Sequence, residues 1–197
     1  MLRVQHALLS PMESLVSAST AVVPANAVAN SRSAWSVLKF GGTSVSKRSR
    51  WDTIGRLAMA RQAESGPVLV VVSAISGVTN ALLAIIDAAQ RDADKTAALV
   101  SALCETHREF AATLQIDADG VIGHRFAELR ALSGDARATC ADVGWQAELQ
   151  ALGELMSSAL GEAYLNQQGI PIRWIDARQH MRAIVLPNTT EIGRAHV

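Results

Sequence analysis

The stretch Val37-Leu38-Lys39-Phe40-Gly41-Gly42-Thr43-Ser44 decides the fold, because it joins a short apolar run directly to a pair of glycines. Residues 37–40 have the composition of a strand, and the glycines predict a tight loop after it. Residues 51–64 follow with Ile54, Leu57 and Ala58 at helical spacing. Residues 37–64 are therefore predicted to form a strand, a loop and a helix in succession.

A second unit of the same kind occupies residues 68–90. Gly66-Pro67 ends the first helix, and Val68-Leu69-Val70-Val71-Val72 is an unbroken apolar run typical of a strand buried on both faces. Residues 73–80 form a second loop, and a helix is expected over residues 81–90. Two consecutive strand–loop–helix units predict an α/β fold, with a parallel sheet and helices on its faces.

The rest of the chain reads as mainly helical, with one more strand. Turn signals at residues 117–120 and 133–135 separate three expected helices, at residues 95–114, 121–132 and 142–168. After Gly169-Ile170-Pro171, the run Ile172-Arg173-Trp174-Ile175 predicts a further strand that ends at Asp176.

Both ends of the chain differ in composition from the part between them. Residues 1–34 are rich in Ser, Ala and Val, with only three charged residues, and show no sustained periodicity. We interpret them as a disordered leader; a mis-assigned start codon or an organelle transit peptide are the alternatives. Residues 191–197 back-translate to what looks like a sequencing adapter, so we expect a non-native tail. Residues 35–190 are left as the part that bears on the fold.

Charge and composition exclude several classes of protein. The chain has 18 Lys+Arg against 18 Asp+Glu, for a formal net charge of +0, and we expect no nucleic-acid partner. No stretch reaches the ~18 apolar residues of a membrane-spanning helix, so we expect no membrane partner. Cys104 and Cys140 lie in helix-like segments and are interpreted as buried free thiols of a cytoplasmic protein. The five scattered histidines indicate no metal site.

The first loop has the residue types that hold phosphate. Gly41 and Gly42 directly follow a strand, where backbone N–H groups can turn toward phosphate oxygens. Lys39 lies at the end of that strand, where its ammonium can neutralise charge on a transferring phosphoryl group. The alternative is that Lys39 only extends from the strand end to water. The loop matches neither a Walker A sequence nor a dinucleotide-binding fingerprint.

Two further places carry polar groups of interest. Ser73 and Thr79 lie in the second loop, at the carboxyl end of a strand, where parallel sheets bind ligands. The alternative makes Thr79 or Asn80 a simple helix N-cap. Glu154 lies opposite the apolar side of its helix, beside Ser157 and Gly161 and without a basic partner, so this side can accept a ligand's ammonium group or another backbone. The alternative is a surface glutamate with no role.

Four motifs together resemble one known family. In order and spacing they resemble the aspartate kinases of the amino-acid kinase family, and the second loop looks closest to bacterial fusions of aspartokinase with diaminopimelate decarboxylase. The motifs are Lys39-Phe40-Gly41-Gly42-Thr43-Ser44-Val45, Val71-Val72-Ser73-Ala74 with Gly77-Val78-Thr79-Asn80, Gly153-Glu154-Leu155-Met156-Ser157, and Trp174-Ile175-Asp176-Ala177-Arg178. The resemblance implies the carbamate kinase-like three-layer α/β/α fold with a mainly parallel sheet, truncated after its N-terminal lobe.

The resemblance also implies a reaction. It is transfer of the γ-phosphoryl group of ATP, with Mg²⁺ on the nucleotide, to the side-chain carboxylate of L-aspartate. The product is 4-phospho-L-aspartate, at the entry to lysine, threonine and methionine biosynthesis. A non-catalytic phosphate- or nucleotide-binding module of the same fold is the alternative.

Carried over residue by residue, the resemblance assigns a role to each motif. Lys39 is the catalytic residue; the ATP-binding residues are Lys39, Phe40, Gly41, Gly42, Thr43 and Ser44; and the aspartate-binding residues are Ser73, Thr79 and Glu154, the last on the α-ammonium group. The family also implies a homo-oligomer for the full-length protein. Because the family's later glycine-rich segment is not seen, we expect the 197-residue chain alone to bind ATP weakly and to have no kinase activity.

Overall fold

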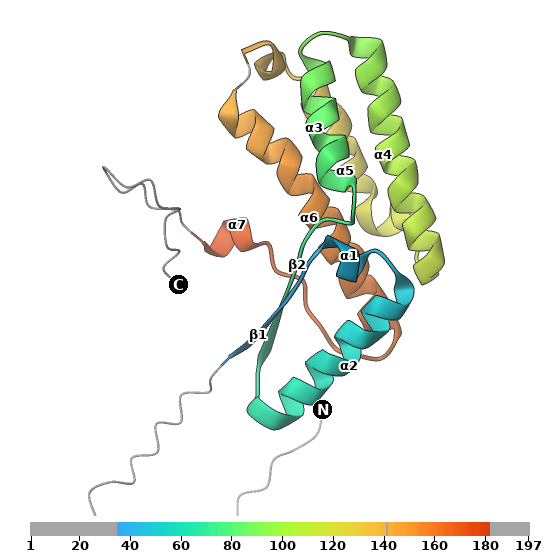
Figure 1. Cartoon of the computed structure of the whole chain (residues 1–197), viewed down its shortest axis with the longest axis vertical. Helices are drawn as coiled ribbons and strands as arrows, with labels where there is room; N and C mark the ends of the chain where they lie inside the picture. The colour runs from blue at the N-terminus through green and yellow to red at the C-terminus, as the bar shows by residue number, and fades with distance from the viewer. Residues whose placement is uncertain (1–34, 141, 182–197) are drawn as a thin grey trace, which may run out of the picture. The chain divides into compact units, whose positions relative to one another are not determined.

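The structure, a computed structural model, describes residues 35–140 and 142–181 (Figure 1). The expectations for residues 1–34 and 191–197 lie outside the described residues. In chain order the elements are β1 (Ser36–Phe40), α1 (Gly42–Val45), α2 (Arg48–Ser65), β2 (Val68–Val72), α3 (Val78–Ala89), α4 (Ala93–Leu114), α5 (Ala118–Ser133), the 3₁₀ helix η1 (Ala136–Cys140), α6 (Val143–Gln167) and α7 (Ala177–His180).

The two strands pair in parallel, as the sequence predicts. Ser36 is opposite Val68, and Phe40 is opposite Val72, with α2 as the crossover between the strands. The predicted α/β class with a parallel sheet is therefore confirmed. One local detail differs, because residues 42–45 wind into a single helical turn, α1, where an open loop was predicted.

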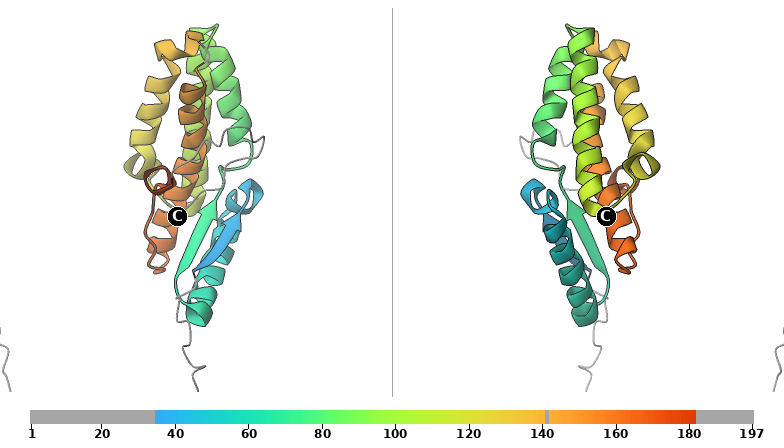
Figure 2. Two further views of the ribbon diagram at one scale, coloured as in Figure 1. Left: turned by 90° about the vertical axis from the view of Figure 1, so that its left-hand side faces the viewer. Right: turned by 90° about the vertical axis from the view of Figure 1, so that its right-hand side faces the viewer.

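Burial alternates along both strands, so only one face of the sheet is covered within the described residues. Phe40 and Val72 pack against the core, whereas Leu69 and Val71 are 38% and 39% exposed on the other face. Figure 2 shows α2 on one side of the two strands. The prediction that β2 is buried on both faces is wrong for the described residues, which supply two of the three expected layers: the sheet and the helices on one face.

The crossover helix α2 begins three residues before its predicted start. Its buried face consists of Trp51, Ile54, Gly55 and Ala58, at the i, i+3, i+4, i+7 spacing of an amphipathic helix. Leu57, predicted to lie on this face, is 39% exposed. The buried face of α2 includes Trp51 and the positions that lie on the same side of the helix as Trp51. Leu57 does not lie on that side.

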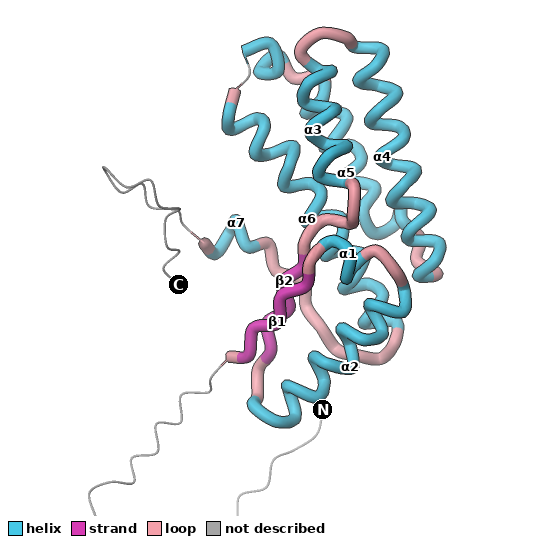
Figure 3. Tube along the Cα trace, in the orientation of Figure 1, coloured by secondary structure: helices cyan, strands magenta, loops and turns pink. Residues whose placement is uncertain are grey.

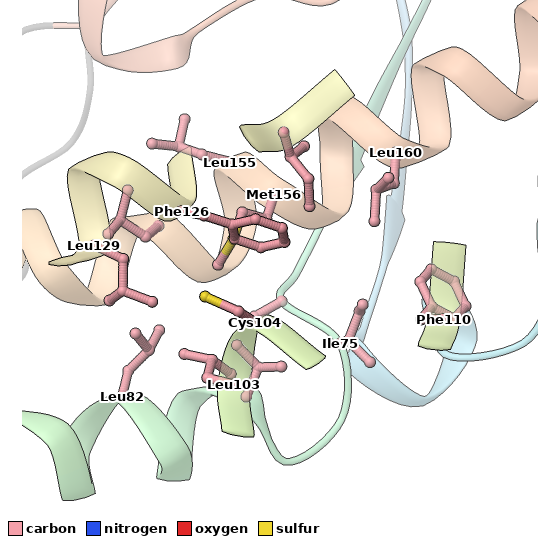
Figure 4. Close-up of a cluster of buried hydrophobic side chains, with 14 of the residues drawn as sticks. Ile75, Leu82, Leu103, Cys104, Phe110, Phe126, Leu129, Leu155, Met156 and Leu160 are labelled. Carbon is pink, nitrogen blue, oxygen red and sulfur yellow. The ribbon is translucent and has the colours of Figure 1, made fainter. Parts of the chain in front are cut away.

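The helices α3 to α6 pack against one another and continue the core away from the sheet (Figures 1 and 2). Their starts and ends agree with the prediction to within three residues. Figure 4 shows the apolar side chains that they bury, among them Leu82, Phe126 and Met156. Cys104 belongs to this core as predicted, but Cys140 is exposed in η1, which corrects the prediction of two buried thiols.

Residues 172–175 are not a strand, and Figure 3 draws them as a loop. Side chains of α6 bind two of the backbone N–H groups of this segment. The N–H of Ile172 donates to Asn166 Oδ1 across 3.1 Å, and the N–H of Trp174 donates to Glu162 Oε1 across 2.9 Å. The predicted strand is therefore wrong, because α6 competes with β2 for the hydrogen bonds of this segment.

Candidate active site

The two loops that follow the strands lie together at one end of the sheet, because both strands run in the same direction. We call residues 41–47 the first loop and residues 73–77 the second loop. The Ser73 N–H donates to the Phe40 carbonyl across 3.1 Å. At Gly42 the two loops are so close that a Cβ added to Gly42 would lie 2.8 Å from the Ala74 carbonyl oxygen. Glycine is needed at position 42 for this close approach, not for its φ angle.

A side chain also joins the two loops. The Ser46 hydroxyl donates to the Gly42 carbonyl across 2.5 Å and accepts from the Ser76 N–H across 2.9 Å. The sequence analysis did not single out Ser46, because a serine after a glycine turn carries no pattern of its own.

The third motif reaches the second loop from α6. The Glu154 carboxylate accepts from the Ala74 N–H across 3.3 Å, and the Ser157 hydroxyl donates to the Ser73 carbonyl across 2.8 Å. A Cβ added at Gly153 would lie 2.9 Å from the Ala74 side chain. The expectation that the small-residue side of this helix admits another backbone is confirmed, and Glu154 itself is exposed beside that contact.

Lys39 and Phe40 lie on opposite faces of β1. The Lys39 side chain is exposed on the open face, opposite Val71, and has no hydrogen-bond or ion-pair partner among the described residues. The Phe40 side chain packs against the core, so only its backbone borders the first loop. Within the first loop, Thr43 is exposed, whereas Ser44 is half-buried and donates its N–H to the Gly41 carbonyl.

The two polar residues of the second motif differ in their surroundings. Ser73 is half-buried, and within the described residues its hydroxyl has no hydrogen-bond partner. Thr79 is exposed in the first turn of α3 and does not cap it. The N-cap is Gly77, at φ +88°, a left-handed conformation that favours glycine. The alternative interpretation of Thr79 or Asn80 as the helix N-cap is therefore wrong.

A buried network behind the first loop was missed by the sequence analysis. The Trp51 indole N–H donates to the Val45 carbonyl across 2.9 Å, and the ring packs against Gly161 of α6. Tyr164 donates its hydroxyl to Asp52, and burial, followed by that bond, raises the pKa of Tyr164. These contacts fix the first loop to the helix that carries Glu154. The helical spacing of Trp51 with Ile54 and Ala58 is the signal that predicts the burial of Trp51.

The fourth motif supplies an internal ion pair. Arg178 lies 2.7 Å from Asp176, which is 6% exposed, and this bond lowers the pKa of Asp176. The Arg178 guanidinium is thus engaged at the start of α7. Within residues 35–140 and 142–181, no group of three His, Cys, Asp or Glu side chains is placed to hold a metal ion. None of the helices in the same ranges is both long and apolar enough to cross a bilayer.

The fold agrees with comparisons to known proteins. Residues 34–195 match the amino acid kinase family, and the chain belongs to this family. It is 30% identical over 168 residues to the chloroplastic bifunctional aspartokinase/homoserine dehydrogenase 1 of Arabidopsis thaliana. It is 29% identical over 147 residues to bifunctional aspartokinase/homoserine dehydrogenase 2 of Escherichia coli strain K12. The predicted resemblance to aspartokinases is confirmed.

Solved structures of E. coli aspartokinase III have the same fold over this region. The complex with lysine and aspartate superposes with a TM-score of 0.64 at 24% identity, and covers 83% of this chain and 35% of its own. The complex with aspartate and ADP superposes with a TM-score of 0.63 at 26% identity, and the match covers 82% of this chain and 34% of that one. The match to the Arabidopsis relative covers 79% of this chain but only 17% of that protein. The match to the E. coli relative covers 74% of this chain and 18% of that protein. The chain therefore spans less than a fifth of the length of either relative.

Proposed function

We propose that these residues belong to an aspartate kinase, which transfers the γ-phosphoryl group of Mg²⁺-bound ATP to the side-chain carboxylate of L-aspartate. The observation that carries the proposal is the convergence of the first and third motifs on Ser73-Ala74 of the second motif: the first loop contacts it at Gly42, and α6 contacts it at Gly153 and Glu154. The E. coli aspartokinase III structure with aspartate and ADP supports it through its fold.

The proposed roles are those that the resemblance implies, and the positions of the groups support them. The first loop would hold ATP phosphates with its backbone N–H groups, and exposed Lys39 would stabilise negative charge on the group in transfer. Ser73, whose hydroxyl has no partner among the described residues, and Thr79 would contact aspartate. Glu154 keeps one carboxylate oxygen on Ala74, and the other would bind the α-ammonium group. The reaction needs positioning and charge stabilisation more than a nucleophile from the protein.

The wider setting is part of the same proposal. We propose a cytoplasmic homo-oligomer that acts at the entry to lysine, threonine and methionine biosynthesis. The two bifunctional relatives are named as fusions of aspartokinase with homoserine dehydrogenase. A fusion with diaminopimelate decarboxylase therefore stays a prediction that rests on the second loop alone.

The experiment is aspartate-dependent formation of ADP, measured on the chain and on any longer product of its gene. Lys39→Ala is expected to abolish turnover while leaving the thermal midpoint of unfolding unchanged, because the side chain is exposed and without a partner among the described residues. Turnover equal to the wild type would contradict the role of Lys39. Nucleotide binding without phosphoryl transfer in the longest gene product would favour the non-catalytic binding module.

A further inference from the structure

Ser46 is the residue whose side chain bonds to both loops. Its hydroxyl donates to a carbonyl of the first loop, at Gly42, and accepts an N–H of the second loop, at Ser76. Both functions of the hydroxyl are thus used, one on each loop. We infer that Ser46 is a positioning residue that couples the two loops, so that ordering one loop orders the other.

The other contacts between the loops do not replace this bond. The approach of Gly42 to the Ala74 carbonyl limits how closely the loops can come together, but it does not hold them together. The Phe40–Ser73 bond joins the last residue of β1 to the first residue of the second loop, and so it does not bond to the first loop. Within the described residues, the Ser46 hydroxyl is the hydrogen-bond partner of the Ser76 N–H. Because Ser76 is exposed, water would replace this bond in a Ser46→Ala variant. The direct side-chain link between the loops would then be lost, and each loop would keep its own contacts with the helices.

The consequence for catalysis rests on the proposed function. There the first loop holds the phosphoryl donor and the second loop contacts the acceptor, so Ser46 would set the distance between the two reactants. Phosphoryl transfer depends strongly on this positioning. The coupling itself depends only on the two hydrogen bonds.

The first test uses the 197-residue chain without ligand. Amide hydrogen exchange, read by mass spectrometry, is compared for wild type, Ser46→Ala, Ser46→Thr and Thr53→Ala. Thr53 is the matched control, because its hydroxyl bonds within its own helix, to the Ser49 carbonyl. Ser46→Ala is expected to speed exchange by about two- to tenfold in both loops, the range of one hydrogen bond. Ser46→Thr, which keeps the hydroxyl, and Thr53→Ala are expected to match the wild type.

The second test adds ADP to the longest product of the gene, because the 197-residue chain alone is expected to bind nucleotide weakly. In the wild type, ADP is expected to slow exchange in both loops, and in Ser46→Ala only in the first loop. An absence of any ADP effect in the wild type would overturn the proposed nucleotide site, and the ligand-free comparison then decides the coupling by itself. Faster exchange confined to one loop in ligand-free Ser46→Ala, or no rescue by Ser46→Thr, would overturn the inference.

Discussion

The Glu154 carboxylate accepts a hydrogen bond from the backbone N–H of Ala74, with 3.3 Å between Oε1 and N. One turn further along α6, Ser157 donates to the Ser73 carbonyl across 2.8 Å. A single helical turn therefore holds both polar groups of the peptide bond between Ser73 and Ala74. The position of the second loop is in this way fixed by the helix that also presents the candidate ammonium-binding carboxylate.

Two substitutions separate the structural and the binding role of Glu154. Glu154→Gln keeps an oxygen that accepts from Ala74 but removes the charge, whereas Glu154→Ala removes both. We expect Glu154→Ala to lower the free energy of unfolding by about 1 kcal/mol and Glu154→Gln to leave it unchanged. Both should weaken aspartate binding by roughly ten- to hundredfold, because each loses the charged bond to the α-ammonium group.

Urea denaturation and aspartate titration are the measurements for this pair. The assay is made on the longest product of the gene, so that aspartate binding and stability refer to one protein. Equal destabilisation by Glu154→Gln and Glu154→Ala would show that the charge, and not the acceptor oxygen, holds the second loop. Unchanged aspartate affinity in Glu154→Gln would remove the ammonium-binding role.

The contact between Gly161 and Trp51 leads to a second prediction. A Cβ at Gly161 would lie 1.9 Å from the Trp51 ring, which is 2% exposed. We expect Gly161→Ala to destabilise the fold by on the order of 2 kcal/mol through overpacking. Because the Trp51 indole also holds Val45, exchange in the first loop should rise as well.

Gly123→Ala is the matched control for this substitution. Gly123 is also a helical glycine, on α5, but its added Cβ would meet nothing closer than 3.8 Å. The gain in helix propensity should then stabilise the protein by about 0.5 to 1 kcal/mol. Chemical denaturation of both variants measures their free energies of unfolding. Similar changes in the two variants would mean that the Trp51 ring moves aside without destabilising the fold.

Much of the site was predictable because it is encoded locally. The first loop follows from glycines directly after a strand, and the parallel pairing follows from two strand–helix units in sequence. Ser157 and Gly161 leave one side of α6 without bulk, which predicted that another backbone could approach it, but not that the second loop is that backbone. In each of these cases the deciding residues are close together in the chain.

The errors arise where distant residues compete. Residues 172–175 have strand composition, but Asn166 and Glu162 of α6 take their backbone N–H groups, which no pattern within the segment reveals. Leu57 fits the helical spacing, but the bulk of Trp51 rotates the buried face of α2 away from it. The Ser46 bridge depends on where a loop 30 residues later comes to lie.

Stability should depend on pH through His107, which is 0% exposed on α4. Its Nδ1 lies 2.9 Å from the Leu103 carbonyl, which can only accept, so Nδ1 carries the proton of the neutral ring. Nε2 has no hydrogen-bond partner in the structure. Burial lowers the pKa of His107, and the bond to Leu103 opposes this shift in part.

The direction of the pH effect follows from this lowered pKa. As the pH falls below about 6.5, the ordinary pKa of histidine, the unfolded chain takes up a proton before the folded one does. The contribution of neutral His107 is fully present above that pH and is lost at up to about 1.4 kcal/mol per pH unit below it. Asp119 has a pKa lowered by Arg108, so its contribution is lost only at more acid pH, below its ordinary value of 3.8.

His107→Leu should therefore flatten the decline in the free energy of unfolding below about pH 6.5, the ordinary pKa of histidine, because the pKa of His107 is lowered in the folded protein. Urea denaturation at a series of pH values measures the slope, which is independent of any change in stability at neutral pH. His124→Gln, at an exposed position on α5, is the control and should keep the wild-type slope. A wild-type slope in His107→Leu would mean that folding does not lower the pKa of His107.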